Sequence, residues 1–247
     1  MPVAREDRIR TYIEGLDRAL SGGIPRGHII LLTGYPGTMK SSLAYSILNQ
    51  NAAQAGLKSV YITLEQSRES LRKQVEALGI DTAPAGDRVS VVDLSQIRKN
   101  LAAASRKTPF LQIFTTYVKN VVGGHEASLV VVDSLNVLET IANWDHRRSN
   151  LFHLFELFRG LETTTILIDE GSMDLHSGER GRDEAYLADT ILDLSLQPVG
   201  ETEAQRRIRC VKMRWSAHET TSFAFLWTGR GFDTTRSVAV TSAKVSR

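Results

Sequence analysis

The stretch HIILLTGYPGTMKSS, residues 28–42, decides the fold because it joins a buried-strand pattern to a glycine-bearing loop and a helix. Ile29 to Leu32 form a short apolar run, and the residues after Ser42 place apolar side chains on one helical face. Strand, small-residue loop, Lys-Ser and helix together are typical of a phosphate-binding loop. In such a loop the backbone N–H groups and the helix N-terminus bind an anion.

The loop predicts individual roles and contains one departure from the usual pattern. Lys40 is expected to reach the terminal phosphates, and the Ser41 hydroxyl is expected to ligate Mg²⁺. The pattern G-x-x-x-x-G-K-[ST] has glycine where this chain has Met39. An ordinary strand–turn–helix corner is the alternative. The residues expected at the nucleotide are Gly34, Tyr35, Pro36, Gly37, Thr38, Met39, Lys40, Ser41 and Ser42.

Composition and charge favour an ordinary globular protein. The 247 residues fit one α/β domain, and the net charge of +2 does not suggest a protein that coats nucleic acid. Cys210 is the single cysteine, so no intrachain disulfide can form, which suits a reducing compartment. The N-terminal residues show no signal peptide, and no apolar run approaches the roughly 18 residues of a membrane span. We therefore expect a cytoplasmic protein without a membrane contact.

Alternating strand and helix patterns predict a mostly parallel sheet with helices on both faces. We expect one domain over residues 12–235, a flexible N-terminus over 1–11 and a disordered tail over 236–247. The last strands are expected to be antiparallel at the sheet edge. Helices are predicted at residues 13–20, up to 55, 67–78, 110–122 and 148–163. Strands are predicted at residues 29–32, 59–64, 89–93, 128–134, 164–168, 191–196, 207–214 and 222–227.

Three acidic residues follow predicted parallel strands, where ligands bind in open α/β sheets. Asp133 is expected to hold Mg²⁺ through water opposite Ser41, although an aspartate there can simply cap a helix. Glu65 is the candidate base for the water that attacks the γ-phosphate; a solvated carboxylate is the alternative. Glu170 is a weaker candidate that senses the γ-phosphate or orients water, against a plain salt bridge.

Two basic residues near the C-terminus form the last candidate group. Lys212 and Arg214 are spaced i and i+2, so they share one face of a strand. Such a pair is usually the solvated face of an edge strand, and its functional alternative is a cation presented to another subunit's phosphates. His218 alone carries little information, and the remaining histidines lack metal-ligand spacing.

The chain resembles the single-domain KaiC-like ATPases of the RecA superfamily over roughly residues 12–235. The resemblance rests on ordered motifs: GLD at 15–17, GGIPRG at 22–27, GYPGTMKS at 34–41, YITLE at 61–65, VVVDSL at 130–135, YLAD at 186–189, KMR at 212–214, and His218. It implies a RecA-like P-loop core that assembles as a ring, usually a hexamer, with ATP between subunits.

The same resemblance implies roles for the basic residues. Lys212 and Arg214 would reach the neighbouring subunit's phosphates, and His218 would lie near the same nucleotide. The family usually has two adjacent glutamates where this chain has Glu65-Gln66, so hydrolysis is expected to be slow.

The leading hypothesis is a Mg-dependent ATPase with a regulatory or signalling role and a protein partner that the sequence does not identify. A nucleotide-gated interaction protein with little turnover is the second, motivated by Met39 and Gln66. A recombinase-like DNA-binding filament is the third. Its predicted mobile loop, residues 171–183, carries Arg180 and Arg182, but acidic residues offset them and the loop has no aromatic platform for bases. Nucleic acid is therefore not favoured.

Overall fold

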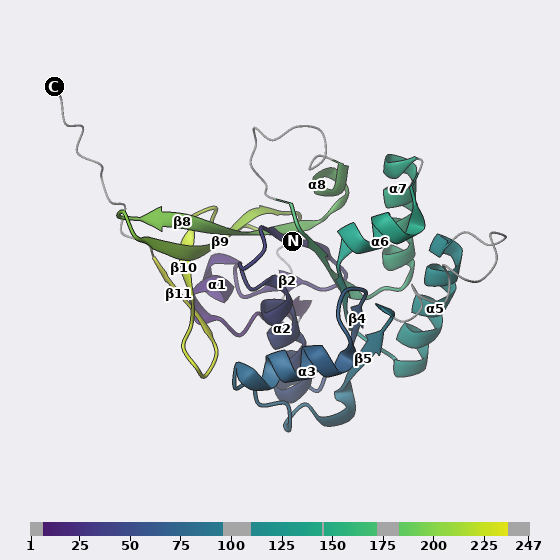
Figure 1. Cartoon of the computed structure of the whole chain (residues 1–247), viewed down its shortest axis with the longest axis horizontal. Coiled ribbons are helices and arrows are strands. Elements are labelled where there is room, and N and C mark those ends of the chain that lie inside the picture. The colour runs from purple at the N-terminus through teal and green to yellow at the C-terminus, as the bar shows by residue number, and fades with distance from the viewer. Residues whose placement is uncertain (1–6, 96–109, 145, 172–182, 237–247) are drawn as a thin grey trace.

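A nine-stranded sheet forms the centre of the computed structural model, which describes residues 7–95, 110–144, 146–171 and 183–236 (Figure 1). Its strand order is β11-β10-β9-β8-β3-β7-β6-β4-β5. The strands are β3 (Ile29–Gly34), β4 (Ser59–Thr63), β5 (Val89–Asp93), β6 (Leu129–Asp133), β7 (Thr164–Asp169), β8 (Thr190–Val199), β9 (Glu203–Met213), β10 (Phe223–Trp227) and β11 (Phe232–Arg236). A separate pair, β1 (Arg8–Ile9) and β2 (Ile24–Pro25), is antiparallel.

The helices lie on both faces of this sheet. They are α1 (Glu14–Ala19), α2 (Lys40–Ala55), α3 (Arg68–Ala77), α5 (Phe110–His125), α6 (Leu135–Ala142), α7 (Arg147–Gly160) and α8 (Asp183–Leu187), with a 3₁₀ turn at Gly86–Arg88. Among the described residues, no helix is long and apolar enough to cross a membrane.

The sheet direction changes at one place. Strands β3, β4, β5, β6, β7 and β8 are parallel to their neighbours within this set, and β9, β10 and β11 follow in antiparallel pairs. The predicted α/β fold of RecA type is therefore confirmed, together with its antiparallel C-terminal edge. The first of the three C-terminal strands predicted for that edge, β8, instead pairs in parallel with β3 near the middle of the sheet.

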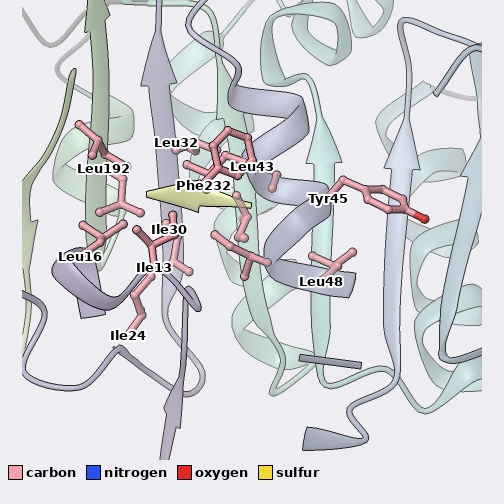
Figure 2. Packing of buried hydrophobic residues seen from close by; sticks show 14 of the residues in the cluster. Ile13, Leu16, Ile24, Ile30, Leu32, Leu43, Tyr45, Leu48, Leu192 and Phe232 are labelled. Atoms are coloured by element: carbon pink, nitrogen blue, oxygen red, sulfur yellow. The ribbon is translucent and has the colours of Figure 1, made fainter. Parts of the chain in front are cut away.

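The two faces of β3 belong to different hydrophobic cores. Ile30 and Leu32 pack with apolar residues of α1, α2 and α3 (Figure 2), while Ile29 and Leu31 pack with those of α5, α6 and α7. A strand buried on both faces reads as a continuous apolar run, which is the pattern that β3 shows. Burial on both sides fixes the strand that delivers the chain to the loop at Gly34.

Several elements differ from the sequence prediction. The segment 1–11 was expected to be flexible, but Arg8 and Ile9 are buried in β1 because they pair with β2. Helix α5 continues through Gly123 and Gly124, at a cost of about 1 kcal/mol per glycine that the packing of Val118 and Val122 offsets. Helices α6 and α8 and strand β11 were not predicted. The tail after Arg236 and most of the loop 171–183 lie outside the described residues.

A bulge interrupts the pairing of β8 with β9. Ile191 is opposite Lys212 and Leu192 is opposite Cys210, so Val211 has no partner of its own. A bulge reorients the side chains that follow it. Cys210 and Met213 pack in the core beneath α1 and α2, whereas Val211 packs in the core on the opposite face. Because of the bulge, two successive residues, Val211 and Lys212, both lie on the side of the sheet opposite to Cys210.

Candidate nucleotide site

The loop between β3 and α2 has the backbone shape of a phosphate cradle. Gly34 has φ +151°, and a Cβ there would lie 2.3 Å from the Leu194 carbonyl oxygen, so only glycine fits. Met39 caps α2 with φ 71° and ψ 29°, the left-handed conformation that glycine usually supplies at this position. Its side chain is partly buried against the core beneath α2. The departure from the usual loop pattern therefore leaves the helix start in place.

Lys40 is held over the loop by backbone carbonyls. Its ammonium donates hydrogen bonds to the Gly34 oxygen at 2.7 Å and the Tyr35 oxygen at 3.2 Å. The side chain is buried, and burial lowers the pKa of Lys40, while Glu170, Asp133 and other nearby carboxylates raise it. A buried cation surrounded by acids is positioned to neutralise a polyanion together with a metal ion.

A cavity of about 440 Å³ joins this loop to the acids predicted at the strand ends. The strands β3, β4, β6 and β7 are parallel and in register, so their carboxyl ends meet at one edge of the sheet. Glu65, Asp133 and Glu170 therefore lie together with Lys40 and Ser41, as the sequence predicted. The cavity is lined by Pro36, Gly37, Met39, Lys40, Ser41, Ser42, Glu65, Gln74, Asp133, Ile168, Glu170 and Arg206.

Asp133 is the most enclosed of the three acids. The Tyr61 hydroxyl donates to its carboxylate at 2.5 Å, and Ser41 forms a further hydrogen bond with it. Burial raises the pKa of Asp133, and these two hydrogen bonds oppose the rise. Ser41 and Asp133 thus present a hydroxyl and a carboxylate oxygen side by side. Such oxygen donors suit Mg²⁺, which binds proteins through one or two carboxylates and completes its shell with phosphate oxygens and water.

The other two acids face each other across the cavity. The Ser134 hydroxyl donates a hydrogen bond to Glu65, which is exposed to solvent. The pKa of Glu170 is raised by burial and then by the charge of Glu65. A carboxyl group with a raised pKa, such as Glu170, can keep its proton and act as a hydrogen-bond donor.

Gln66, at the position where the sequence departs from the adjacent glutamates of the resembled family, belongs to a chain of amides. Its Nε2 donates to the Gln74 oxygen at 3.3 Å, and the Gln74 Nε2 donates to the Ser42 hydroxyl at 3.0 Å. The Ser70 hydroxyl donates to the Gln66 oxygen at 3.2 Å. These contacts tie the segment after β4 to the first turn of α2.

Lys212 and Arg214 do not lie in this cavity. Lys212 donates to the carbonyl oxygens of Ala185 at 2.7 Å and Ala188 at 2.6 Å, at the end of α8. Arg214 donates to Asp189 at 3.1 Å and to the Tyr186 oxygen at 2.8 Å. Lys212 is opposite Ile191 of β8, near the amino end of the parallel strands, whereas the cavity is at their carboxyl end.

The same end of the sheet holds His218. Its Nδ1 lies 3.4 Å from the Ser216 oxygen, and the next residue, Glu219, donates its backbone N–H to the oxygen of Ala19, the last residue of α1. Burial and the charge of Arg214 lower the pKa of Lys212 to about 8, although Asp189 raises it. Within one chain, these basic residues and His218 are separate from the phosphate loop.

Sequence reasoning missed four polar residues that the structure connects to the cavity. Gln74 and Arg206 line it, while Tyr61 and Ser134 hydrogen-bond to its acids. Ser134 had a signal, because it directly follows the acid at the end of β6. The other three had none, since their proximity depends on how α3, β4 and β9 pack.

A phosphate-binding loop between a central strand and its helix, with acids at the ends of neighbouring parallel strands, defines a P-loop ATPase fold of the RecA type. Comparison with known families makes this specific. The family model described as the KaiC ATPase matches residues 9–236, and the chain belongs to this family.

Individual relatives are similar along nearly the whole chain. A UPF0273 protein from Thermotoga maritima is 27% identical over 91% of this chain and 94% of its own length. The circadian clock protein KaiC2 from Synechocystis is 26% identical over 87% of this chain, which corresponds to 38% of that protein. The crystal structure of a KaiC-like protein from Pyrococcus horikoshii has a TM-score of 0.77 at 25% identity and covers 92% of this chain and 98% of its own.

Proposed function

We propose that the chain is a Mg-dependent ATPase that binds ATP at the boundary between two copies and uses slow hydrolysis in a regulatory or signalling role in the cytoplasm. The observation that carries the proposal is the cavity that joins Lys40 and Ser41 to Asp133 and Glu65. Family membership supports nucleotide binding of the RecA and KaiC type.

The loop residues bind and neutralise the triphosphate in this proposal. The backbone N–H groups at the N-terminus of α2 face the anion, and Lys40 donates to its terminal oxygens. Ser41 and Asp133 would hold Mg²⁺, which supplies charge compensation for the phosphate oxygens when bound. Tyr61 orients the Asp133 carboxylate through its hydrogen bond.

Glu65 accepts a proton from the water that attacks the γ-phosphate. Its carboxylate is solvent-exposed and oriented by the Ser134 hydroxyl, so it is positioned to accept the proton of a water beside the γ-phosphate. Glu170, with its raised pKa, is the candidate that orients the water or senses the γ-phosphate. A general base of this kind contributes about 10²–10⁴-fold to rate.

A second copy supplies the remaining contacts to the nucleotide. Lys212, Arg214 and His218 lie away from their own chain's cavity, so they act only on a neighbour's nucleotide. A head-to-tail contact of this kind closes into a ring, and we propose a hexamer. A cation donated in trans stabilises charge on the transferred phosphoryl group.

A phosphate-release assay tests the catalytic part. Purified chain with Mg-ATP is expected to release phosphate, and Glu65→Gln is expected to release it about 100-fold more slowly while ATP affinity stays within about twofold. Glu69→Gln, on the exposed face of α3, is the matched control and keeps full turnover. Absence of turnover in the wild-type chain, or equal turnover in Glu65→Gln, contradicts the ATPase.

The second candidate is a nucleotide-gated interaction protein with little turnover. Gln66 favours it, because its amide is bound to Gln74 and Ser70 and cannot act as a base. This candidate predicts tight ATP binding, negligible phosphate release and capture of a protein partner that depends on ATP. The arginine-bearing loop that motivated a DNA-binding role lies almost entirely outside the described residues.

A further inference from the structure

Among the described residues that line the phosphate cavity, Arg206 is the one basic side chain besides Lys40. It lies on β9, about 170 residues after the loop in sequence, and no motif predicts it. Its Nε donates a hydrogen bond to the Gly37 carbonyl oxygen at 2.9 Å. A side chain from a distant hairpin therefore holds the tip of the phosphate loop.

The β8–β9 hairpin reaches this position because it is longer than the strands beside it. Gly34, the last residue of β3, is opposite Leu194, while β8 continues to Val199. Arg206 is opposite Leu196, two residues beyond that end, and Figure 1 shows the hairpin projecting from the sheet. The overhang places Arg206 beside the loop rather than beside the strand.

The bonded carbonyl belongs to the exposed part of the loop. Tyr35, Pro36 and Gly37 are exposed, and Gly37 has φ +84°, a conformation that costs a glycine little to enter or leave. In a trans peptide the C=O and the following N–H point in opposite directions. By holding the Gly37 oxygen, Arg206 fixes the orientation of the Gly37–Thr38 peptide, whose N–H donates to the Tyr35 oxygen at 3.4 Å and closes the turn at the tip of the loop.

We propose that Arg206 is a positioning residue of the nucleotide site, which holds the phosphate loop in its anion-binding shape and adds a positive charge from the same chain to the cavity. The inference rests on the proposed function. It differs from the contribution of Lys212 and Arg214, because Arg206 acts within its own subunit and on binding rather than on the chemical step.

Nucleotide titration with kinetics tests the proposal. Arg206→Ala is expected to raise the Kd of both ADP and ATP about tenfold, the loss of one charge-assisted hydrogen bond, with kcat at saturating ATP within about twofold of wild type. Arg206→Lys keeps a charged donor and is expected to recover most of the affinity. If Arg206 only stabilised the fold, the variant would not show a raised Kd together with an unchanged kcat.

Two control variants separate the contact from its surroundings. Gln205→Ala changes the neighbouring residue of β9, which is outside the cavity lining, and Arg230→Ala removes one positive charge from the turn between β10 and β11. Both are expected to bind like wild type. Equal affinity of Arg206→Ala and wild type, or an equal loss in either control, overturns the positioning role and leaves the ATPase standing. A wild-type chain that binds neither ADP nor ATP overturns both proposals.

Discussion

The two ends of the parallel strands use basic residues in opposite ways. At the carboxyl end, Lys40 is buried among acids in a cavity that its own chain completes. At the amino end, Lys212 and Arg214 are hydrogen-bonded to carbonyl oxygens and Asp189 around the end of α8, away from that cavity. The difference teaches that the chain gathers a buried cation and acids at one end of the strands, while the basic residues at the other end lie outside that cavity and act on a nucleotide only in the proposed assembly.

Removal of the cavity's central cation is expected to have the largest effect. Lys40→Ala should weaken ATP binding by about 100-fold or more, because a buried, charge-assisted contact to the phosphates is lost. Lys73→Ala, an exposed lysine paired with Glu69 at 2.8 Å, is the control and should bind normally. Calorimetric titration measures both. Retained affinity in Lys40→Ala would show that the carboxyl end is not the anion site.

Mixing two variants with lowered turnover tests whether Lys212, at the amino end of the strands, acts on a neighbouring chain's nucleotide. Lys212→Ala is expected to lower turnover by about tenfold or more, because a cation that stabilises the transferred phosphoryl group is removed. When equal amounts of Lys212→Ala and Glu65→Gln chains are mixed, about a quarter of the contacts between chains combine an intact Glu65 with a neighbour's intact Lys212. Activity should return at these contacts.

The mixing experiment has a clear contrary result. Turnover of the mixture that equals the mean of the two separate variants would mean that no contact is shared between chains. Size measurement with and without ATP checks that the chains assemble under the assay conditions.

The charge of Lys212 should make turnover depend on pH. Its pKa is lowered to about 8, so the ammonium is present below pH 8 and lost as the pH rises above it. Turnover is expected to fall about tenfold between pH 7 and pH 9. Lys212→Arg keeps its charge throughout this range and should flatten the profile. A wild-type profile without a step near pH 8 would contradict a catalytic contribution from the ammonium.

The smallest effect is expected at Met39. Met39→Gly relieves a left-handed conformation that costs a side-chain residue about 1–2 kcal/mol, but it also removes a partly buried side chain and loosens the unfolded chain. These contributions oppose each other, so ATP affinity should change by about threefold or less. Binding that appears only in Met39→Gly would mean that the natural loop does not bind nucleotide.

Sequence patterns predicted the carboxyl end well because its geometry follows from strand direction. An acid directly after an apolar parallel strand lies at the sheet edge whatever the helices do, which is why Glu65, Asp133 and Glu170 were found. The left-handed backbone at Met39 lies at the position where the loop pattern has glycine. The roles of all these residues in binding and catalysis stay predictions.

The missed features depend on lengths and packing that a local pattern does not contain. Arg206 reaches the loop only because the hairpin extends past β3, and its sequence neighbours give no sign of that overhang. Helix α6 begins directly after β6 and is eight residues long, so its apolar residues merge with those of the strand. Helix α5 continues through two glycines because burial of its apolar face stabilises the helix by more than their low helix propensity costs.

The bulge at Val211 makes the amino end tolerant of a change in chain length. Val211 is the residue without a partner, so its removal would restore the regular alternation of side chains between Cys210 and Lys212. Lys212 would stay opposite Ile191 and keep the face that meets α8, and Met213 would stay in the core beneath α1 and α2. A single-codon deletion at Val211 would thus straighten the strand without moving its basic residue to the other side of the sheet.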